Sequence, residues 1–493
     1  MSTPYSPDKN GKRISGYAPS FSRDPMFGFS AVQDDSSNIS MGIATSTSVG
    51  TAIIDRIVMG VIGKGLSPMS APEKSLLNWT DKQAKRFQDE AETFWRLYSS
   101  SDKFDWYGKN NFSQIQQIAL RDILIYGDCL LHRGYRRKNN SVTPFVQLIA
   151  GNMVRNSNYI DSKRNRGGVL FHENSDIESG YEIAVIAENL MDTFSTKAVQ
   201  RFNSNGFKEF DLISLKNLSE KATRGIPLLN PVRGDILMLE KIKNNYLVKM
   251  SVQNIFALFL KKTSDAPDNG ASLNEKLMGL DLGQGIESEE ERKIDLGPGV
   301  IIDGERGEEA QILQAATQSA DFAQMVKTLL ENISSACYGL PYEVLLSSFN
   351  SSFSASRASI NIAEKSFSAI RSEFVSKFNT PVWDMVIDYG IRIGMVHAPG
   401  YTFGKNEFID KAILASTWTG VTPVQVDPVK EVNAYTTALN AGLCTREFAI
   451  RNLYGLDAEE VFERMAKEKR YMEELGLGEQ PASAKGDIDD EEE

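Results

Sequence analysis

Hydrophobic residues follow two different periods in the first third of the chain. Within 73–98 and again within 112–126 they recur every three or four residues, which predicts two amphipathic helices. The runs 128–135 and 145–150 are short and mostly apolar, and they flank a polar stretch at 136–143. This order predicts two strands joined by a turn. Helices and strands are therefore expected to be mixed in this region.

Two long helical patterns enclose a polar segment in the middle of the chain. Residues 232–262 and 316–338 carry apolar side chains at helical spacing. The residues between them, 263–315, are mostly polar, rich in glycine and dense in charge. We expect two helices that bracket a compact insertion, with a short strand after Gly299. Between 151 and 225, further strand-like pieces are expected, such as 181–186.

A run of small polar residues precedes the longest predicted helix. The run covers 347–356, and the helix is expected to reach about residue 395. Its aromatic stripe, which includes Phe367 and Phe374, is expected to be core and not a stacking platform for bases. Pro381 removes a backbone donor and clashes with the preceding turn, so we expect the helix to bend there.

Short helices with clear caps are predicted near the end of the chain. Asp427, followed by Pro428, is expected to cap one helix, and Asp457 with Glu460 another. Two glycines are expected to stop helices; they are Gly442 and Gly476.

Composition places the chain among globular proteins of several packed units. It has 493 residues, of which 41% are hydrophobic and 24% charged. The longest apolar run, Ile255 to Leu260, is too short to span a membrane, and no secretory signal is expected at the N-terminus. Three cysteines lie far apart, which argues against a disulfide framework and a cysteine zinc site; they are Cys129, Cys337 and Cys444.

The charge of the chain argues against tight binding to nucleic acid. The formal net charge is −11, and six acidic residues lie within 487–493. Proteins that hold DNA tightly usually carry a basic stripe, which this sequence lacks. Contact with nucleic acid is therefore expected to be loose. Residues 1–50 are rich in Ser, Gly, Pro and Asn, so a flexible N-terminal arm is expected.

No motif for catalysis is present. The three histidines, His132, His172 and His397, lack the spacing that holds a metal on one helix face. The glycines between Gly60 and Gly65 lack the spacing and the Ser or Thr of a phosphate-binding loop. A nuclease with scattered carboxylate ligands for a metal ion stays open as an alternative, because such ligands leave no readable motif.

Eight short groups of residues occur in a particular order between about 95 and 475. They are Trp95 with Asp105 and Gly108; Arg121 with Gly127 and Asp128; Arg224 to Pro227; Leu296 to Gly299; Ile333 with Gly339 to Leu345; Phe353 to Ala358; Trp418; and Asp427 to Glu431. In this order and spacing they resemble the portal proteins of tailed bacteriophages, the lambda-type family. Where that family usually has Tyr-Ser-Ser-x-Arg, this chain has Phe-Ser-Ala-Ser-Arg.

The resemblance implies a ring, typically of twelve copies, at one capsid vertex. Double-stranded DNA would enter and leave through its channel. The implied fold is α+β, with no enzymatic activity and no cofactor or metal. The implied division is a flexible arm (1–50), a mixed α/β wing (51–231), a stem helix (232–262), a small inserted clip (263–315), a second stem helix (316–338), a DNA-facing loop with the long kinked helix and the rest of the wing (339–426), a helical crown (427–478) and an acidic tail (479–493).

The resemblance also implies partners and a location. The partners are further copies of the chain, the DNA, the terminase large subunit, the major capsid and scaffold proteins and a head-tail adaptor, with no membrane. The protein would be assembled in the host cytoplasm and reside in the virion, at the portal vertex.

Two groups of site residues follow from this mapping. The DNA-facing loop would present Asn350, Ser351, Ser352, Ser354, Ser356 and Arg357. The clip would dock the motor through Glu289, Glu290, Glu291 and Arg292. Small neutral side chains suit DNA that slides, because their hydrogen bonds exchange easily. An ordinary solvated loop is the alternative for the Ser/Asn run, and Arg357 contacts either phosphate or an ion-pair partner within the ring.

Overall fold

The fold is known from a computed structural model, which describes residues 33–138, 141–156, 164–185, 195–215, 222–255, 259–262, 308–311, 319–347, 353–420, 428–455 and 458–475. The chain forms two compact units. Unit 1 comprises 1–233 together with 334–493, and unit 2 comprises 234–333. Helices and small antiparallel sheets are mixed in this structure, as the sequence predicted.

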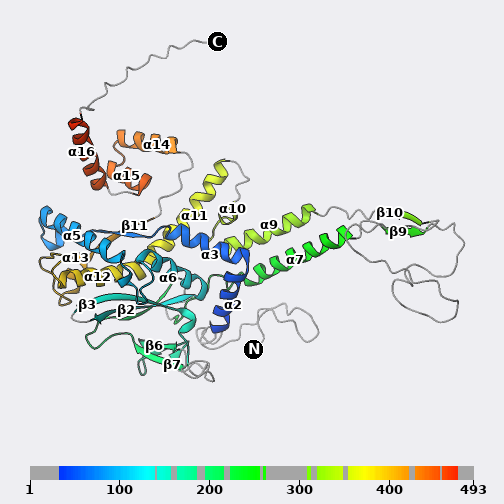
Figure 1. The fold of residues 1–493 in the computed structure, drawn as a ribbon, viewed down its shortest axis with the longest axis horizontal. Helices are drawn as coiled ribbons and strands as arrows, with labels where there is room; N and C mark the ends of the chain where they lie inside the picture. The colour runs from blue at the N-terminus through cyan, green and yellow to red at the C-terminus, as the bar shows by residue number, and fades with distance from the viewer. Residues whose placement is uncertain are drawn as a thin grey trace, which may run out of the picture. The chain divides into compact units, whose positions relative to one another are not determined.

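Several helices of unit 1 pack as a layer beside its sheets (Figure 1). The first of them are α2 (Gln33–Ser46), α3 (Ser48–Val61), α4 (Lys74–Leu77), α5 (Asp81–Ser99) and α6 (Phe112–Tyr126). Reciprocal capping boxes start α5 and α6, from Thr80 and Asn111 respectively. The helix predicted at 112–126 is confirmed. The helix predicted at 73–98 is divided, because Asn78 adopts a left-handed φ of 52° and ends α4.

The predicted N-terminal arm, 1–50, is wrong for its last part. Residues 33–46 form α2, and Ser36, Ser37 and Ser40 on this helix are buried. The Ser37 hydroxyl donates a hydrogen bond to the carbonyl of Tyr126, at the end of α6. Small serine side chains here permit close helix packing, so serine content did not indicate flexibility. Residues 1–32 lie outside the described residues.

Aromatic side chains form the core of the helical layer. The Trp95 ring lies 4.9 Å from that of Phe112, 5.4 Å from Trp383 and 5.7 Å from Trp418, measured between centroids. Each such pair contributes about 0.5–1.5 kcal/mol beyond its buried area. These contacts join α5 and α6 to residues nearly 300 positions later in the chain, so the layer depends on both halves of unit 1.

Two antiparallel sheets complete the mixed part of unit 1. One has the order β3-β2-β8 and the other β4-β5-β6-β7. Their bounds are β2 (Asp128–Lys138), β3 (Ser141–Ala150), β8 (Phe210–Ser214), β4 (Asn165–Arg166), β5 (Val169–Phe171), β6 (Glu178–Val185) and β7 (Ser195–Gln200). The buried side chains of Leu130, Val169 and Tyr181 belong to one core cluster that the two sheets share.

The strands predicted in this region are confirmed, with longer bounds. The hairpin of β2 and β3 extends past the predicted strand ends at 135 and 145, so most of the polar stretch 136–143 pairs as strand. The strand predicted at 181–186 is part of β6 up to 185, and residue 186 lies outside the described residues.

The longest helical segment contains a change of winding. It consists of α11 (Phe353–Phe374), a π-helical turn η3 (Val375–Asn379) and α12 (Thr380–Arg392). The Thr380 N–H bonds to the Val375 carbonyl, five residues back. This wider turn ends two residues before Pro381, where the bend stays a prediction. Phe367 and Phe374 are buried, so their assignment to the core is confirmed.

Unit 2 is built on a pair of helices, α7 (Arg233–Ile255) and α9 (Ser319–Ala336), which lie side by side (Figure 1). The rings of Tyr246 and Phe322 stack with their centroids 4.2 Å apart. Beyond α7, β9 (Phe259–Lys262) pairs with β10 (Glu308–Gln311). The helix predicted for 232–262 is therefore wrong at its end, where residues 259–262 form a strand. Of the helix predicted at 316–338, residues 319–336 are helical, and 316–318 lie outside the described residues.

The remaining elements are short. They are β1 (Ser67–Ser70), η1 (Asp102–Phe104), η2 (Gly151–Met153), α10 (Tyr342–Leu346), α13 (Glu407–Leu414), β11 (Ser416–Thr419), α14 (Pro428–Asn440), α15 (Arg446–Tyr454) and α16 (Ala458–Glu474). β1 pairs antiparallel with β11. Gly442 has a φ of 70° and ends α14, as predicted. Three other predicted caps, Asp427, Asp457 and Gly476, lie outside the described residues.

Candidate functional site

The segment predicted to face DNA is partly helical. Ser347 has a left-handed φ of 53° and ends α10. Ser354, Ser356 and Arg357 lie within α11, which begins at residue 353. Their assignment to a loop is therefore wrong, because small residues such as Ser and Ala are well accepted in a first helical turn. The other predicted loop residues, Asn350, Ser351 and Ser352, lie outside the described residues.

Both ends of this segment are fixed to unit 1. The guanidinium of Arg56, on α3, donates to the hydroxyl of Ser347. The hydroxyl of Ser359, on α11, lies 3.4 Å from a carboxylate oxygen of Glu343 on α10. Arg357 is half-buried, and both interpretations of its role stay open. The five residues 348–352 therefore connect α10 to α11, and both helices make contacts close to this connection.

The predicted docking residues of the clip lie outside the described residues: Glu289, Glu290, Glu291 and Arg292. Within 263–315, the structure describes only 308–311, the strand β10. Its antiparallel pairing with β9 brings the start and the end of the insertion together.

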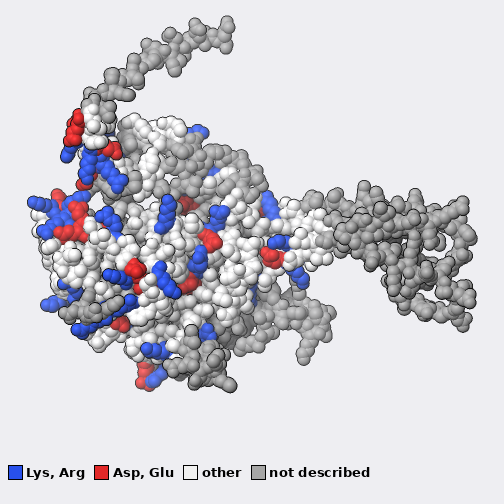
Figure 2. All heavy atoms as spheres, in the orientation of Figure 1, with Lys and Arg blue, Asp and Glu red and all other residues white. Residues whose placement is uncertain are grey.

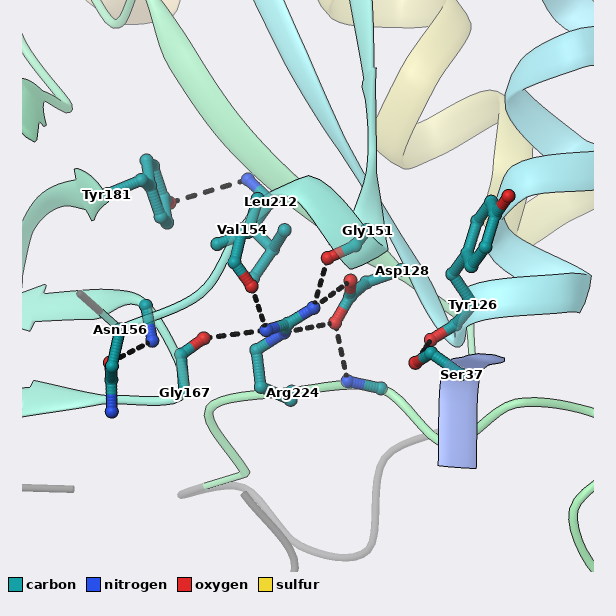
Figure 3. Close-up of polar contacts among 12 residues, drawn as sticks. Ser37, Tyr126, Asp128, Gly151, Val154, Asn156, Gly167, Tyr181, Leu212 and Arg224 are labelled. Carbon is teal, nitrogen blue, oxygen red and sulfur yellow. Dashed lines mark hydrogen bonds and ion pairs between the residues drawn. The ribbon is translucent and has the colours of Figure 1, made fainter. Parts of the chain in front are cut away.

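Arg224 and Asp128 form a buried ion pair in unit 1 (Figure 3). Arg224 is 2% exposed and Asp128 is 0% exposed. The Arg224 Nε and Nη2 atoms donate to the two Asp128 carboxylate oxygens, at 2.7 and 2.9 Å. This bidentate geometry is the strongest form of an arginine-carboxylate contact. The charge of each partner is therefore compensated inside the protein.

The same guanidinium also binds three backbone carbonyls (Figure 3). Nη2 donates to the carbonyl of Gly151 at 2.7 Å, and Nη1 donates to those of Val154 and Gly167 at 2.7 and 2.6 Å. We call Arg224, Asp128 and these three carbonyls the Arg224 cluster. It joins the start of β2, the turn η2 and the loop before β5, so it fixes the two sheets to each other.

The glycines beside this ion pair allow the backbones to meet. An added Cβ at Gly127 would lie 2.3 Å from the Gly225 carbonyl oxygen, and one at Gly225 would lie 2.0 Å from the Gly127 carbonyl oxygen. Gly127 also has a φ of 93°. Two of the sequence groups that carry the family resemblance thus contact each other directly: Gly127 with Asp128, and Arg224 with Gly225. The sequence alone assigned no role to them.

Asp105, from another of these groups, organises a surface loop. Its carboxylate accepts hydrogen bonds from the backbone N–H groups of Tyr107, Lys109 and Asn110, at 3.1 to 3.2 Å. Gly108 supplies the left-handed φ of 64° that the turn needs. Asp105 and Gly108 therefore stabilise the shape of this loop, which is a structural role.

Two carboxyl groups have strongly shifted pKa values. Burial raises the pKa of Asp122 to about 7, and the nearby Arg121 acts in the opposite direction. Burial likewise raises the pKa of Asp384 to about 7, against the influence of Arg133. Among the described residues, no three Asp, Glu, His or Cys side chains come together as ligands for a metal ion. The described helices are also too short or too polar to cross a membrane.

Comparison with known proteins gives one family match. The model of a family described as phage portal protein, lambda family, matches residues 40–371. No curated protein matches the sequence.

Among solved structures, the chain is similar to three from gene transfer agent (GTA) particles. The first, described as the virion of the native GTA particle, is 10% identical, with 85% of this chain and 93% of that chain covered and a TM-score of 0.39. The neck of the native particle, computed with C12 symmetry, is 10% identical, with 81% and 98% covered and a TM-score of 0.36. The neck of the empty particle, computed with C6 symmetry, is 11% identical, with 78% and 94% covered and a TM-score of 0.37.

Proposed function

Because the chain belongs to the lambda family of phage portal proteins, we propose that twelve copies close into a ring at one capsid vertex, through which double-stranded DNA is packaged and ejected. The match to residues 40–371 carries this proposal, since it runs from α2 into α11 and includes all of unit 2. As a portal protein, the chain is a structural component of the capsid vertex and not an enzyme.

The physical requirements of a DNA channel fit this chain. A contact between two different surfaces, repeated by rotation, closes into a ring with an axial hole. Because the net charge is −11, much of the surface of such a ring should repel phosphate. Weak attraction is an advantage in a conduit, since many fixed ion pairs would hold the duplex in place.

Unit 2 supplies the stem and the clip in this proposal. On its two helices, Leu237, Val248 and Met325 have exposed side chains. Neighbouring copies would cover these apolar residues, which two isolated helices cannot bury. The insertion 263–315, closed by β9 and β10, would then be the clip that docks the terminase motor.

The five residues between α10 and α11 would form the DNA-facing loop. Support comes from the contacts on either side, made by Ser347 at the end of α10 and by Ser359 within α11, and from the neutral sequence of 348–352. The capsid and scaffold proteins, the head-tail adaptor, a location at the portal vertex of the virion and assembly in the host cytoplasm complete the proposal.

Electron microscopy of the purified full chain tests the ring directly. We expect closed rings with a central hole, and a mass of many hundred kilodaltons by light scattering. A monodisperse monomer that neither scaffold nor capsid protein converts to rings would contradict the proposal. Metal-dependent cleavage of DNA by a small species would instead favour the nuclease alternative.

A further inference from the structure

A basic and aromatic surface lies where the loop 101–110 packs on the β2-β3 hairpin. We call it the Trp106 patch. It consists of Lys103, Trp106, Tyr107, Lys109 and Arg136. Figure 2 shows Lys and Arg side chains gathered at the edge of the molecule where β2 and β3 lie. The family assignment gives this patch no role.

The centre of the patch is rigid. The Arg136 guanidinium lies over the Trp106 ring, with Cζ 4.6 Å from its centroid, and Arg136 Nη2 donates to the Trp106 carbonyl at 2.7 Å. The backbone N–H of Trp106 donates to the carbonyl of Val146 on β3 at 2.9 Å. A cation and an aromatic ring are therefore held in one arrangement before any partner binds, which lowers the entropy cost of binding.

Two large aromatic side chains of the patch face solvent. Trp106 is 41% exposed and Tyr107 is 61% exposed. The Asp105 carboxylate holds the loop through the N–H groups of Tyr107 and Lys109, so the exposure is a property of a defined loop. Exposed Trp and Tyr beside arginine are typical of binding surfaces.

The cations of the patch are available to a partner. Lys103 and Lys109 are exposed, and neither forms a salt bridge with another described residue. Within 101–110 the acidic residues are Asp102, which is exposed, and Asp105, whose charge the loop backbone already uses. The patch thus favours an acidic partner that also brings an apolar group.

We infer that the Trp106 patch binds the acidic C-terminal segment of this chain, residues 487–493, from the same or an adjacent copy. This segment reads Asp-Ile-Asp-Asp-Glu-Glu-Glu, so it offers six carboxylates for the cations and Ile488 for the exposed aromatic rings. The described chain ends at Leu475. The 18 residues beyond it span up to about 60 Å when extended.

The experiment compares the full chain with a chain that ends at Gly486. The probe is a labelled synthetic peptide of residues 480–493. We expect it to bind the shortened chain, to bind the full chain less well because the tail already occupies the patch, and to dissociate as salt is added. In the shortened chain, the double variant K103E/K109E should weaken binding about tenfold, because each substitution replaces attraction with repulsion.

A matched control makes the same two charge reversals elsewhere on the surface. The double variant K82E/K405E alters two other exposed lysines and should change peptide binding by less than about twofold. Lys82 lies in the first turn of α5, about 25 Å of helix away from the end that leads into the patch. Unfolding curves of both variants establish that they are folded.

Cross-linking tests the contact in the intact protein. A carbodiimide should join the tail carboxylates of the full chain to Lys103 or Lys109, as read by mass spectrometry. The inference is overturned if the tail cross-links only to other lysines, or if K103E/K109E binds the peptide as the unaltered chain does. It is also overturned if short duplex DNA binds the full and the shortened chain equally through these lysines, because the patch is then a nucleic-acid site. None of these outcomes depends on ring formation, so a failure here leaves the proposed portal function standing.

Discussion

The guanidinium of Arg224 and the carboxylate of Asp128 depend on each other, because both are buried. A buried ion pair adds little net stability, yet the loss of one partner leaves an uncompensated charge in the interior. The three carbonyls that Arg224 binds do not replace a negative charge. The Arg224 cluster should therefore be sensitive to the smallest change in its charge.

The first prediction concerns this pair. Asp128→Asn keeps the shape of the side chain and should lower the free energy of unfolding by about 3–5 kcal/mol, measured by denaturant unfolding of the unassembled chain. The control is Asp55→Asn at the exposed pair of Asp55 with Arg121, where the loss should stay below about 1 kcal/mol. Equal losses in the two variants would contradict the assigned role of burial.

The second prediction is a pH dependence. The pKa of Asp122 is raised from 3.8 to about 7 by burial, so the native state keeps a proton that the unfolded chain has already released. The free energy of unfolding should therefore fall as the pH rises from about 4 to about 7. Asp122→Asn should remove this contribution, leaving stability near pH 4 unchanged and raising it at pH 8 by about 1–3 kcal/mol.

Asp384 allows a check on that result. Its pKa is raised in the same way, so Asp122→Asn alone should leave part of the slope and the double variant with Asp384→Asn should remove most of it. The measurement is the midpoint of thermal unfolding between pH 4 and 8. If the unfolding midpoint changes with pH equally in all variants, groups other than Asp122 and Asp384 control the pH dependence.

At the residue scale, the sequence predicted local features better than distant contacts. The buried phenylalanines of α11 and the stop at Gly442 follow from spacing and backbone preference. The pairing of Asp128 with Arg224 joins residues 96 positions apart, and no local pattern indicates it. The order of short motifs indicated that these residues are part of the family pattern, but it did not indicate that they form an ion pair.

At the scale of elements, the errors occur where distant pairing decides the structure. The run Ile255 to Leu260 is apolar throughout, so its pattern fits a buried helix and a buried strand equally well. Its last residues form β9 because β10, almost 50 residues later, supplies the hydrogen bonds. The loop predicted at 347–356 was too long for a similar reason, since contacts to α3 and α10 hold residues on both of its sides.

The third prediction concerns the contact of α3 with α11. A Cβ at Gly60 would lie 2.5–2.7 Å from three atoms of the buried Phe367 ring. Gly60→Ala should therefore separate the helices and cost about 1–3 kcal/mol. Gly42→Ala on α2 is the control, because a Cβ there meets nothing within 4 Å. That variant should be neutral or stabilising by up to about 1 kcal/mol, so calorimetry should find opposite signs.

The fourth prediction concerns the segment 348–352. Removal of Ser351 and Ser352 should leave ring formation and capsid incorporation near normal, because the segment is short and the removed side chains are small and polar, but it should impair packaging or retention of DNA. Replacement of Asn350, Ser351 and Ser352 by lysines should slow translocation by adding phosphate contacts that weaken with salt. Replacement of the same residues by glycines is the neutral control. The measurement is DNA content per capsid beside ring yield.

That result also decides between the two interpretations of the segment. If the shortened chain packages and retains full-length DNA at the normal rate, 348–352 is an ordinary surface turn. The channel constriction then lies elsewhere.

At the scale of the whole molecule, the division into two units separates two tasks. Unit 1 contains the aromatic core and the Arg224 cluster, whereas the described part of unit 2 has a helix pair with exposed apolar residues. The stability of unit 1 is therefore internal, and that of unit 2 is expected to depend on neighbouring copies. Periodicity predicted the helix pair, and the resemblance implied that the wing, 51–231, continues in 339–426, beyond that pair.

The fifth prediction follows from the absence of a phosphate-binding motif in the sequence. The pure protein should not hydrolyse ATP, with or without DNA, and a separate motor should dock on the clip. Charge reversal at Glu289, Glu290 and Glu291 should weaken motor binding and leave the ring intact, because exposed charges affect association more than folding. DNA-stimulated ATP hydrolysis by the pure protein would contradict this division of labour.

The two-part construction of unit 1 has a consequence for its synthesis on the ribosome. Arg371, on α11, binds the carbonyls of Gly60 and Val61 across about 310 positions in the chain. At about 5–20 residues per second, the part of α3 that packs on α11 waits roughly 15–60 s for this partner, whereas α2 and α6 pack on other parts of α3 and are made early. A nascent chain in that interval is open to aggregation. We therefore expect the nascent chain to be most prone to aggregation before α11 has been translated.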